Sequence, residues 1–204
     1  MPIRYLSRLV LGAACAAVLA GCATPSAPLT HPTAQVGAYR DTIDLSGKLS
    51  VNYQKDGQPQ SITGNFTWNQ HPGNIDVALM SPLGQTVATI NVTPTAATLT
   101  QSGRAPRTEK DIDTLTAQTL GWTLPVAGLR DWLQGYATDA AGKRFAASPA
   151  NNSVTTNDGW RLRFVEWQDS PGAALPMPRR IDAERSATAD GGDLAIRIIV
   201  APAG

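Results

Sequence analysis

Residues 121–135 have the sequence GWTLPVAGLRDWLQG, and this short apolar stretch determines how the rest of the chain must fold. Leu129, Trp132 and Leu133 are spaced three and four residues apart, which places them on one face of a helix. Pro125 suits the start of that helix because its φ is fixed and it has no N–H to donate. The glycine that closes the stretch suits its end. The segment therefore predicts a short helix with one strongly apolar face.

Outside this helix the hydrophobic period is two, which is typical of β-strands with one buried face. Lys55-Asp56-Gly57, His71-Pro72-Gly73-Asn74 and Asp158-Gly159 are turn signals between apolar and polar alternations. The regular spacing of these turns predicts an up-and-down antiparallel sheet. Strands are expected between residues 43 and 101, again after residue 136, and as a final pair over residues 180–185 and 194–200.

Two further helical segments are expected. Residues 33–41 fit a short amphipathic helix with Val36 and Tyr39 facing inward, and Thr108 resembles the N-terminal cap of a helix that ends at Gly121. A long sheet with one apolar face must curl or be covered, because that face is unstable in water. We therefore expect a curled antiparallel sheet with the two central helical segments as a lid. Such a fold encloses an apolar cavity if the core side chains do not fill it.

The N-terminus indicates export and lipid attachment. Residues 1–21 have the basic start, short apolar core and small residues of a signal peptide, and Leu19-Ala20-Gly21-Cys22 resembles a bacterial lipobox. An ordinary secretory signal with an incidental cysteine is the alternative. Cys22 would be the acylated residue, and Ala23 in place of aspartate favours the outer membrane. Residues 22–33 contain several prolines and form a tether, followed by a single domain over residues 34–204.

Composition excludes several classes of function. Without Arg4 and Arg8 of the signal segment, the chain has 15 of its 17 basic residues against 16 acidic ones, a net charge of −1, which argues against nucleic-acid binding. Cys15 and Cys22 are the two cysteines, so the folded part has neither a disulfide nor a cysteine metal site. His31 and His71 fit solvated loops, and no hydrolase, zinc or phosphate-binding motif is present. We expect a non-enzymatic monomer without cofactor or metal.

One apolar residue stands in a turn where polar residues are the norm. Leu83 lies between Pro82 and Gly84 in the sequence Ser-Pro-Leu-Gly. Either its side chain folds back onto the sheet edge, or it protrudes and contacts a lipid or an acyl chain.

Three features together resemble the LolB family of outer-membrane lipoprotein receptors: the lipobox ending in Cys22, the turn at residues 81–84, and the helical stretch at residues 121–135 followed by strands. The resemblance covers nearly the whole mature chain, and the helical stretch is its most specific motif. It implies an incomplete β-barrel around an apolar cavity covered by helices. It also implies a receptor that accepts lipoproteins from the periplasmic carrier LolA and transfers their acyl chains into the inner leaflet of the outer membrane.

In this resemblance Cys22 matches the acylated anchor, and Leu83 matches an exposed loop leucine that serves insertion into the membrane. Candidate residues for the acyl-chain cavity lie on the helical lid and on the sheet, although each could equally be plain core. They are Leu115, Leu120, Trp122, Leu124, Leu129, Trp132 and Leu133 on the lid, and Phe66, Trp68, Leu79 and Phe164 on the sheet.

Two other readings stay open from the sequence. An anchored protein with the same cavity could bind a glycolipid or a phospholipid, and an envelope lipoprotein with a filled core would bind no apolar ligand. A docking face for the carrier is not evident. The arginines that could form a basic face also suit the solvated side of strands, and they are Arg161, Arg163, Arg179 and Arg180.

Overall fold

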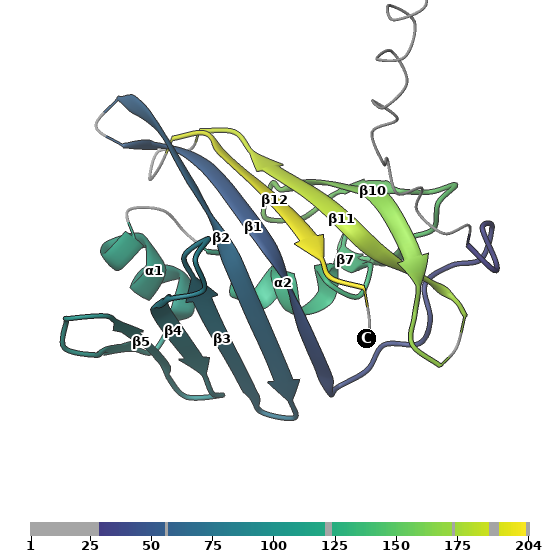
Figure 1. The fold of residues 1–204 in the computed structure, drawn as a ribbon. Helices are drawn as coiled ribbons and strands as arrows, with labels where there is room; N and C mark the ends of the chain where they lie inside the picture. The colour runs from purple at the N-terminus through teal and green to yellow at the C-terminus, as the bar shows by residue number, and fades with distance from the viewer. Residues whose placement is uncertain (1–28, 56, 121–123, 173, 188–191, 203–204) are drawn as a thin grey trace, which may run out of the picture.

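The computed structural model describes residues 29–55, 57–120, 124–172, 174–187 and 192–202. Ten strands form one antiparallel sheet, two form a small second sheet, and two short helices lie on one side of the large sheet (Figure 1). The bounds are β1 Ile43–Lys55, β2 Gln58–His71, β3 Asn74–Met80, β4 Thr86–Val92, β5 Ala97–Gln101, β6 Arg107–Glu109, α1 Ile112–Leu120, α2 Val126–Trp132, β7 Tyr136–Thr138, β8 Arg144–Ala146, β9 Ser153–Thr155, β10 Arg161–Asp169, β11 Pro176–Arg185 and β12 Leu194–Val200.

The large sheet has the up-and-down order that the turn spacing predicts. Strands β1 to β6 are neighbours in chain order, and β12 pairs with β1, so the last strand continues the sheet on its other side. Among the described strands, β6 and β9 stand at the two edges, so the curled sheet does not close into a barrel. The predicted fold class, mainly β with a helical lid, is confirmed.

The apolar face of the sheet and the helices enclose the core. Phe66 and Trp68 on β2, Val77 on β3 and Ile198 on β12 point to the same side and are buried. Helix α2 begins directly after Pro125, as the sequence predicts. Within the described part, neither helix is long and apolar enough to cross a membrane.

The turn that follows α2 needs a glycine at position 135. Gly135 has a φ of +82°, which L side chains rarely adopt, and its N–H donates to the carbonyl of Trp132 at 2.9 Å. A Cβ atom there would also lie 2.5 Å from Val36. The chain therefore leaves the helix in a turn that brings it against the N-terminal segment.

Two predictions of helical structure, one for residues 33–41 and one for Thr108, are wrong. Residues 35–40 form no helix but an extended segment, because its polar groups bond to distant partners: the Val36 N–H donates to the Ala147 carbonyl at 3.0 Å. Thr108 is not a helix cap but part of edge strand β6, and the cap of α1 is Asp111, whose carboxylate accepts from the Thr114 N–H at 2.8 Å.

Glycines allow the strands to approach where the sheet curls. A Cβ atom on Gly47 would lie 2.1 Å from the carbonyl oxygen of Ile199. We expect Gly47→Ala to lower the free energy of unfolding by about 1–3 kcal/mol, because a backbone contact of this kind can only be relieved by moving strands. Urea denaturation measures it, with Gly37→Ala as the control, since its Cβ would meet Leu175 at an ordinary 3.5 Å. Equal stability of the two variants would contradict the close approach.

Candidate functional site

A cavity lies between α2 and the concave face of the sheet. All nine side chains that line it are apolar, and they come from four strands, from α2 and from the residues that flank α2. They are Leu49, Phe66, Trp68, Val77, Leu79, Leu124, Leu129, Leu133 and Ile198.

The cavity is almost filled by its own walls. Its volume is about 20 Å³, which is room for about one water molecule, whereas sites for lipid-sized or drug-sized ligands have volumes of about 300–1,000 Å³. Leu129 of α2 and Leu133 just after it project into the space from the helix side, opposite Trp68 and Leu79 of the sheet. The facing walls therefore leave almost no free space between α2 and the sheet.

Six of the candidate residues from the sequence line this cavity: Phe66, Trp68, Leu79, Leu124, Leu129 and Leu133. The candidates did not include Leu49, Val77 and Ile198. The period-two alternation of their strands places these three on the apolar face, so the sequence pattern could have predicted them.

The other candidates lie elsewhere or outside the described part. Leu115 is buried in α1, which lies against β5 and β6. Trp132 is buried against Trp160 in an edge-to-face contact, with ring centroids 5.5 Å apart and an interplanar angle of 63°, and Phe164 stacks on Phe145. These three are core residues away from the cavity. The side chain of Leu120, all of Trp122 and the anchor candidate Cys22 fall outside the described residues.

The turn between β3 and β4 presents Leu83 to solvent. The Leu83 side chain is 89% exposed, so the alternative in which it folds back onto the sheet is wrong. The turn itself is firmly closed: the Gly84 N–H donates to the Ser81 carbonyl at 2.9 Å, and the Ser81 N–H donates to the Gln85 carbonyl at 2.8 Å. Gly84 has a φ of +83°, which fits its place in the turn. An apolar side chain is thus held outward on an ordered loop.

Acidic groups near the helices have distinct roles. Burial raises the pKa of Asp131 on α2, and the charges of Arg144 and Arg130 act against this rise. Burial also raises the pKa of Asp113, with a further rise from the charge of Asp111. Asp111 itself has a lowered pKa, because Thr114 hydrogen-bonds to its carboxylate at the helix cap. Asp111 therefore caps the start of α1.

Three arginines on the outer face of β10 to β12 are paired with acids: Arg161, Arg180 and Arg197. Arg180 and Arg197 donate to the Asp182 carboxylate at 2.8 and 2.9 Å, and Arg161 lies 3.4 Å from Glu184. Neighbouring opposite charges compensate one another here. This face is therefore not a uniformly basic docking surface, in agreement with its interpretation as a solvated strand face.

The Asp182 network makes stability depend on pH. Burial acts to raise the pKa of Asp182, but the hydrogen bonds and charges of Arg180 and Arg197 prevail and hold it below 3.8. Because the pKa is lower in the folded chain, this contribution is present above pH 3.8 and is lost as the pH falls through the folded-state value. We expect Asp182→Asn to cost about 1 kcal/mol at neutral pH and progressively less in acid.

Urea denaturation of both proteins at several pH values tests this expectation. Glu184→Gln, which removes an exposed partner on the same strand face, is the control. A difference between wild type and Asp182→Asn that does not change with pH would contradict the assignment.

With this geometry established, comparison with known proteins identifies the family. The family model described as outer membrane lipoprotein LolB matches residues 41–201. The chain belongs to the LolB family. An outer-membrane lipoprotein LolB of Cupriavidus taiwanensis is 36% identical over 203 residues, which cover 98% of this chain and 97% of the relative. One from Ralstonia nicotianae is 37% identical over 205 residues, which cover 97% and 96%.

A solved structure of a LolA superfamily protein from Nitrosomonas europaea aligns with 81% of this chain and 86% of its own, at 9% identity and a TM-score of 0.47. The LolB match includes the helical stretch, the turn at Leu83 and every residue that lines the cavity.

Proposed function

We propose that this LolB-family chain is an outer-membrane-anchored receptor for lipoproteins. It accepts their acyl chains from a LolA-like periplasmic carrier and inserts them into the inner leaflet of the outer membrane. The observation that carries the proposal is the wholly apolar cavity between α2 and the sheet. Membership of the LolB family favours lipoproteins over a glycolipid or phospholipid cargo.

The apolar cavity suits transfer because acyl chains are costly to expose. Each CH₂ group released into water costs about 0.8 kcal/mol, so a chain must pass directly from one apolar site to another. The nine lining side chains offer no polar group that would oppose its entry. Opening of α2 creates the space, and the chain then replaces contacts that the walls make with one another in the closed state.

The direction of transfer follows from relative affinity. The proposed reaction makes and breaks no covalent bond, and it draws on no nucleotide. The receptor therefore has to bind acyl chains more tightly than the carrier does, and the bilayer more tightly still.

Different residues serve anchorage to the membrane and insertion of the cargo. Cys22 follows the signal peptide of residues 1–21 and holds the protein at the membrane. Residues 22–33 connect this anchor to the binding domain of residues 34–204, which acts as a monomer. Leu83, held outward by the turn with Pro82 and Gly84, contacts the bilayer at delivery.

Transfer of a labelled lipoprotein tests this function. The mature chain of residues 22–204, with Cys22→Ala to prevent acylation, is mixed with a LolA-like carrier that holds a fluorescent lipoprotein. We expect the label to move to the receptor and then to added liposomes. Retention of all label on the carrier would contradict the receptor function.

A further inference from the structure

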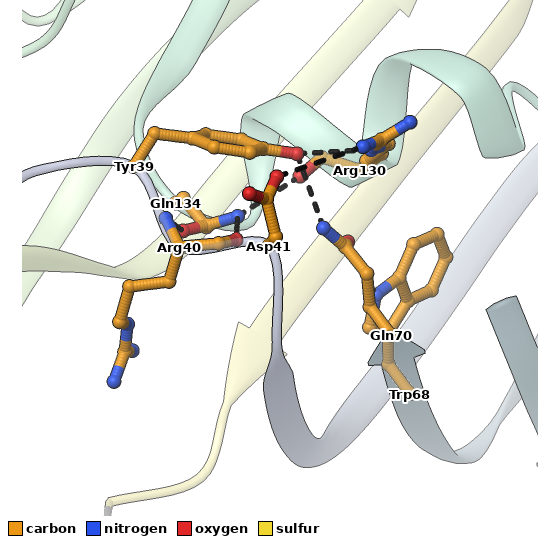
Figure 2. Close-up of polar contacts among 7 residues, drawn as sticks. All are labelled: Tyr39, Arg40, Asp41, Trp68, Gln70, Arg130 and Gln134. Atoms are coloured by element: carbon orange, nitrogen blue, oxygen red, sulfur yellow. Dashed lines mark hydrogen bonds and ion pairs between the residues drawn. The ribbon is translucent and has the colours of Figure 1, made fainter. Parts of the chain in front are cut away.

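An extended segment crosses the end of the helix that closes the cavity. We call residues 35–41 the strap. The Arg40 N–H donates to the Gln134 side-chain oxygen at 2.9 Å, and the Gln134 amide donates back to the Arg40 carbonyl at 3.0 Å (Figure 2). Asp41 adds a 4.0 Å ion pair with Arg130. The strap is thus attached to α2 through Arg130 and to the turn that follows α2 through Gln134.

Within the strap, the Tyr39 hydroxyl joins the helix to the sheet. It accepts a hydrogen bond from Arg130 Nε on α2 at 2.9 Å and another from Gln70 Nε2 on β2 at 3.1 Å (Figure 2). A single oxygen atom therefore bridges the lid and the wall of the cavity.

The Tyr39 bridge continues to the cavity itself. Gln70 is only 1% exposed, and its side-chain oxygen accepts from the Trp68 indole N–H at 3.2 Å. The Trp68 side chain lines the cavity. Three hydrogen bonds in series therefore connect a cavity-lining indole, through a buried amide and the strap, to the lid helix.

We propose that Tyr39, Gln70 and Arg130 form a latch that holds α2 closed, and that acyl-chain entry requires this latch to open. The inference rests on the proposed function. Entry has to displace Leu129, which fills the cavity from α2, and Arg130 is the next residue of the same helix. Movement of that turn away from the sheet separates Arg130 from Gln70, so both cannot keep their bonds to Tyr39. The latch thus opposes binding and sets the affinity for acyl chains.

The strap has a second attachment that does not involve α2, and this provides a matched control. The Tyr136 hydroxyl donates to the Gly37 carbonyl at 2.6 Å, and the Arg144 guanidinium lies 4.4 Å from the centre of the Tyr136 ring. Tyr136→Phe removes a hydroxyl that bonds to the strap, and Tyr39→Phe removes a hydroxyl that is part of the strap. Only Tyr39→Phe removes the bridge between helix and sheet.

Binding of cis-parinaric acid, a fatty acid that fluoresces in apolar surroundings, tests the latch in the unacylated mature chain. We expect Tyr39→Phe to lower the Kd for this probe about five- to tenfold, because it removes bonds made only in the closed state. Tyr136→Phe should leave the Kd within about twofold of wild type. Both variants should have a lower Tm, so tighter binding separates a latch from a merely structural contact.

The outcomes distinguish the latch from the function on which it rests. If wild type binds the probe and Tyr39→Phe binds it equally or more weakly, the latch is overturned and the receptor function stands. Equal tightening by both tyrosine variants would also overturn it, because general loosening of the strap would then suffice. If wild type binds no probe, the acyl-binding function fails and the latch fails with it.

A second variant keeps the test decisive if Tyr39→Phe does not fold. The Arg130 side chain is 46% exposed, so Arg130→Met removes the helix side of the latch at little risk to folding. It should lower the Kd in the same direction as Tyr39→Phe. Hydrogen exchange adds a direct readout: probe binding should speed exchange in the strap of wild type, and slower exchange there would contradict opening.

Discussion

Leu83→Glu is expected to abolish delivery of a bound lipoprotein to liposomes while leaving its uptake from the carrier unchanged. The Leu83 side chain is 89% exposed on a hydrogen-bonded turn, outside the cavity, so its replacement should change neither the fold nor the walls of the cavity. A charged side chain that must enter a bilayer costs about 3 kcal/mol, which corresponds to a loss of about 100-fold in contact with the membrane. Fluorescence of the labelled lipoprotein in each compartment measures uptake and delivery separately.

Two variants of the same turn are matched controls for this result. Leu83→Met keeps an apolar side chain and should retain delivery, whereas Gln85→Glu adds the same charge two residues away without removing the leucine. Loss of delivery in Gln85→Glu as well would show that charge in the loop, not the leucine, is responsible. Normal delivery by Leu83→Glu would contradict the assigned role of Leu83.

Trp132→Ala is expected to have the largest effect on stability. Trp132 is 2% exposed and packs edge-to-face on Trp160, with ring centroids 5.5 Å apart. Its indole also occupies the space that a side chain on Gly128 would need, since a Cβ there would lie 2.5 Å from the ring. Removal of a buried indole costs about 3–5 kcal/mol, a large part of the 5–15 kcal/mol that typically separates folded and unfolded domains.

Urea denaturation followed by circular dichroism measures this loss. Trp167→Ala, in which a partly buried tryptophan of β10 is removed, should cost less than Trp132→Ala, and Trp132→Phe should lie between. A loss of less than about 1 kcal/mol in Trp132→Ala would show that α2 is not fixed by this residue.

The large features of the fold could be predicted because they depend on local periodicity. Alternation along β2 and β3 places Phe66, Trp68 and Leu79 on one face, and that face is the one that lines the cavity. The spacing of Leu129 and Leu133 places them on the inner side of α2 for the same reason. Each of these assignments needs only the geometry of one element.

Features that depend on distant contacts could not be predicted. Residues 33–41 have a helical apolar pattern, but the strap is extended because Arg40 bonds to Gln134 and Val36 to Ala147. Likewise, the curvature of the sheet and the position of α2 on it decide whether a residue on the apolar face lines the cavity or packs in the core. Phe164 is as apolar as Phe66, yet it stacks on Phe145 instead.

The nearly closed cavity illustrates the same limit. A residue pattern specifies which walls are apolar, whereas the distance between them is set by how α2 packs. The volume of about 20 Å³ shows that the facing walls are almost in contact.

The most direct test of the central claim asks whether an acyl chain enters the space under α2. A photoreactive phenylalanine analogue replaces Leu79, which lines the cavity, or Thr67, which belongs to β2 but points to the opposite face. The protein then receives a lipoprotein with radiolabelled acyl chains from the carrier and is irradiated. We predict cross-linking of the label from position 79 and not from position 67. Cross-linking from position 67 alone, or from neither after confirmed transfer, would contradict the account.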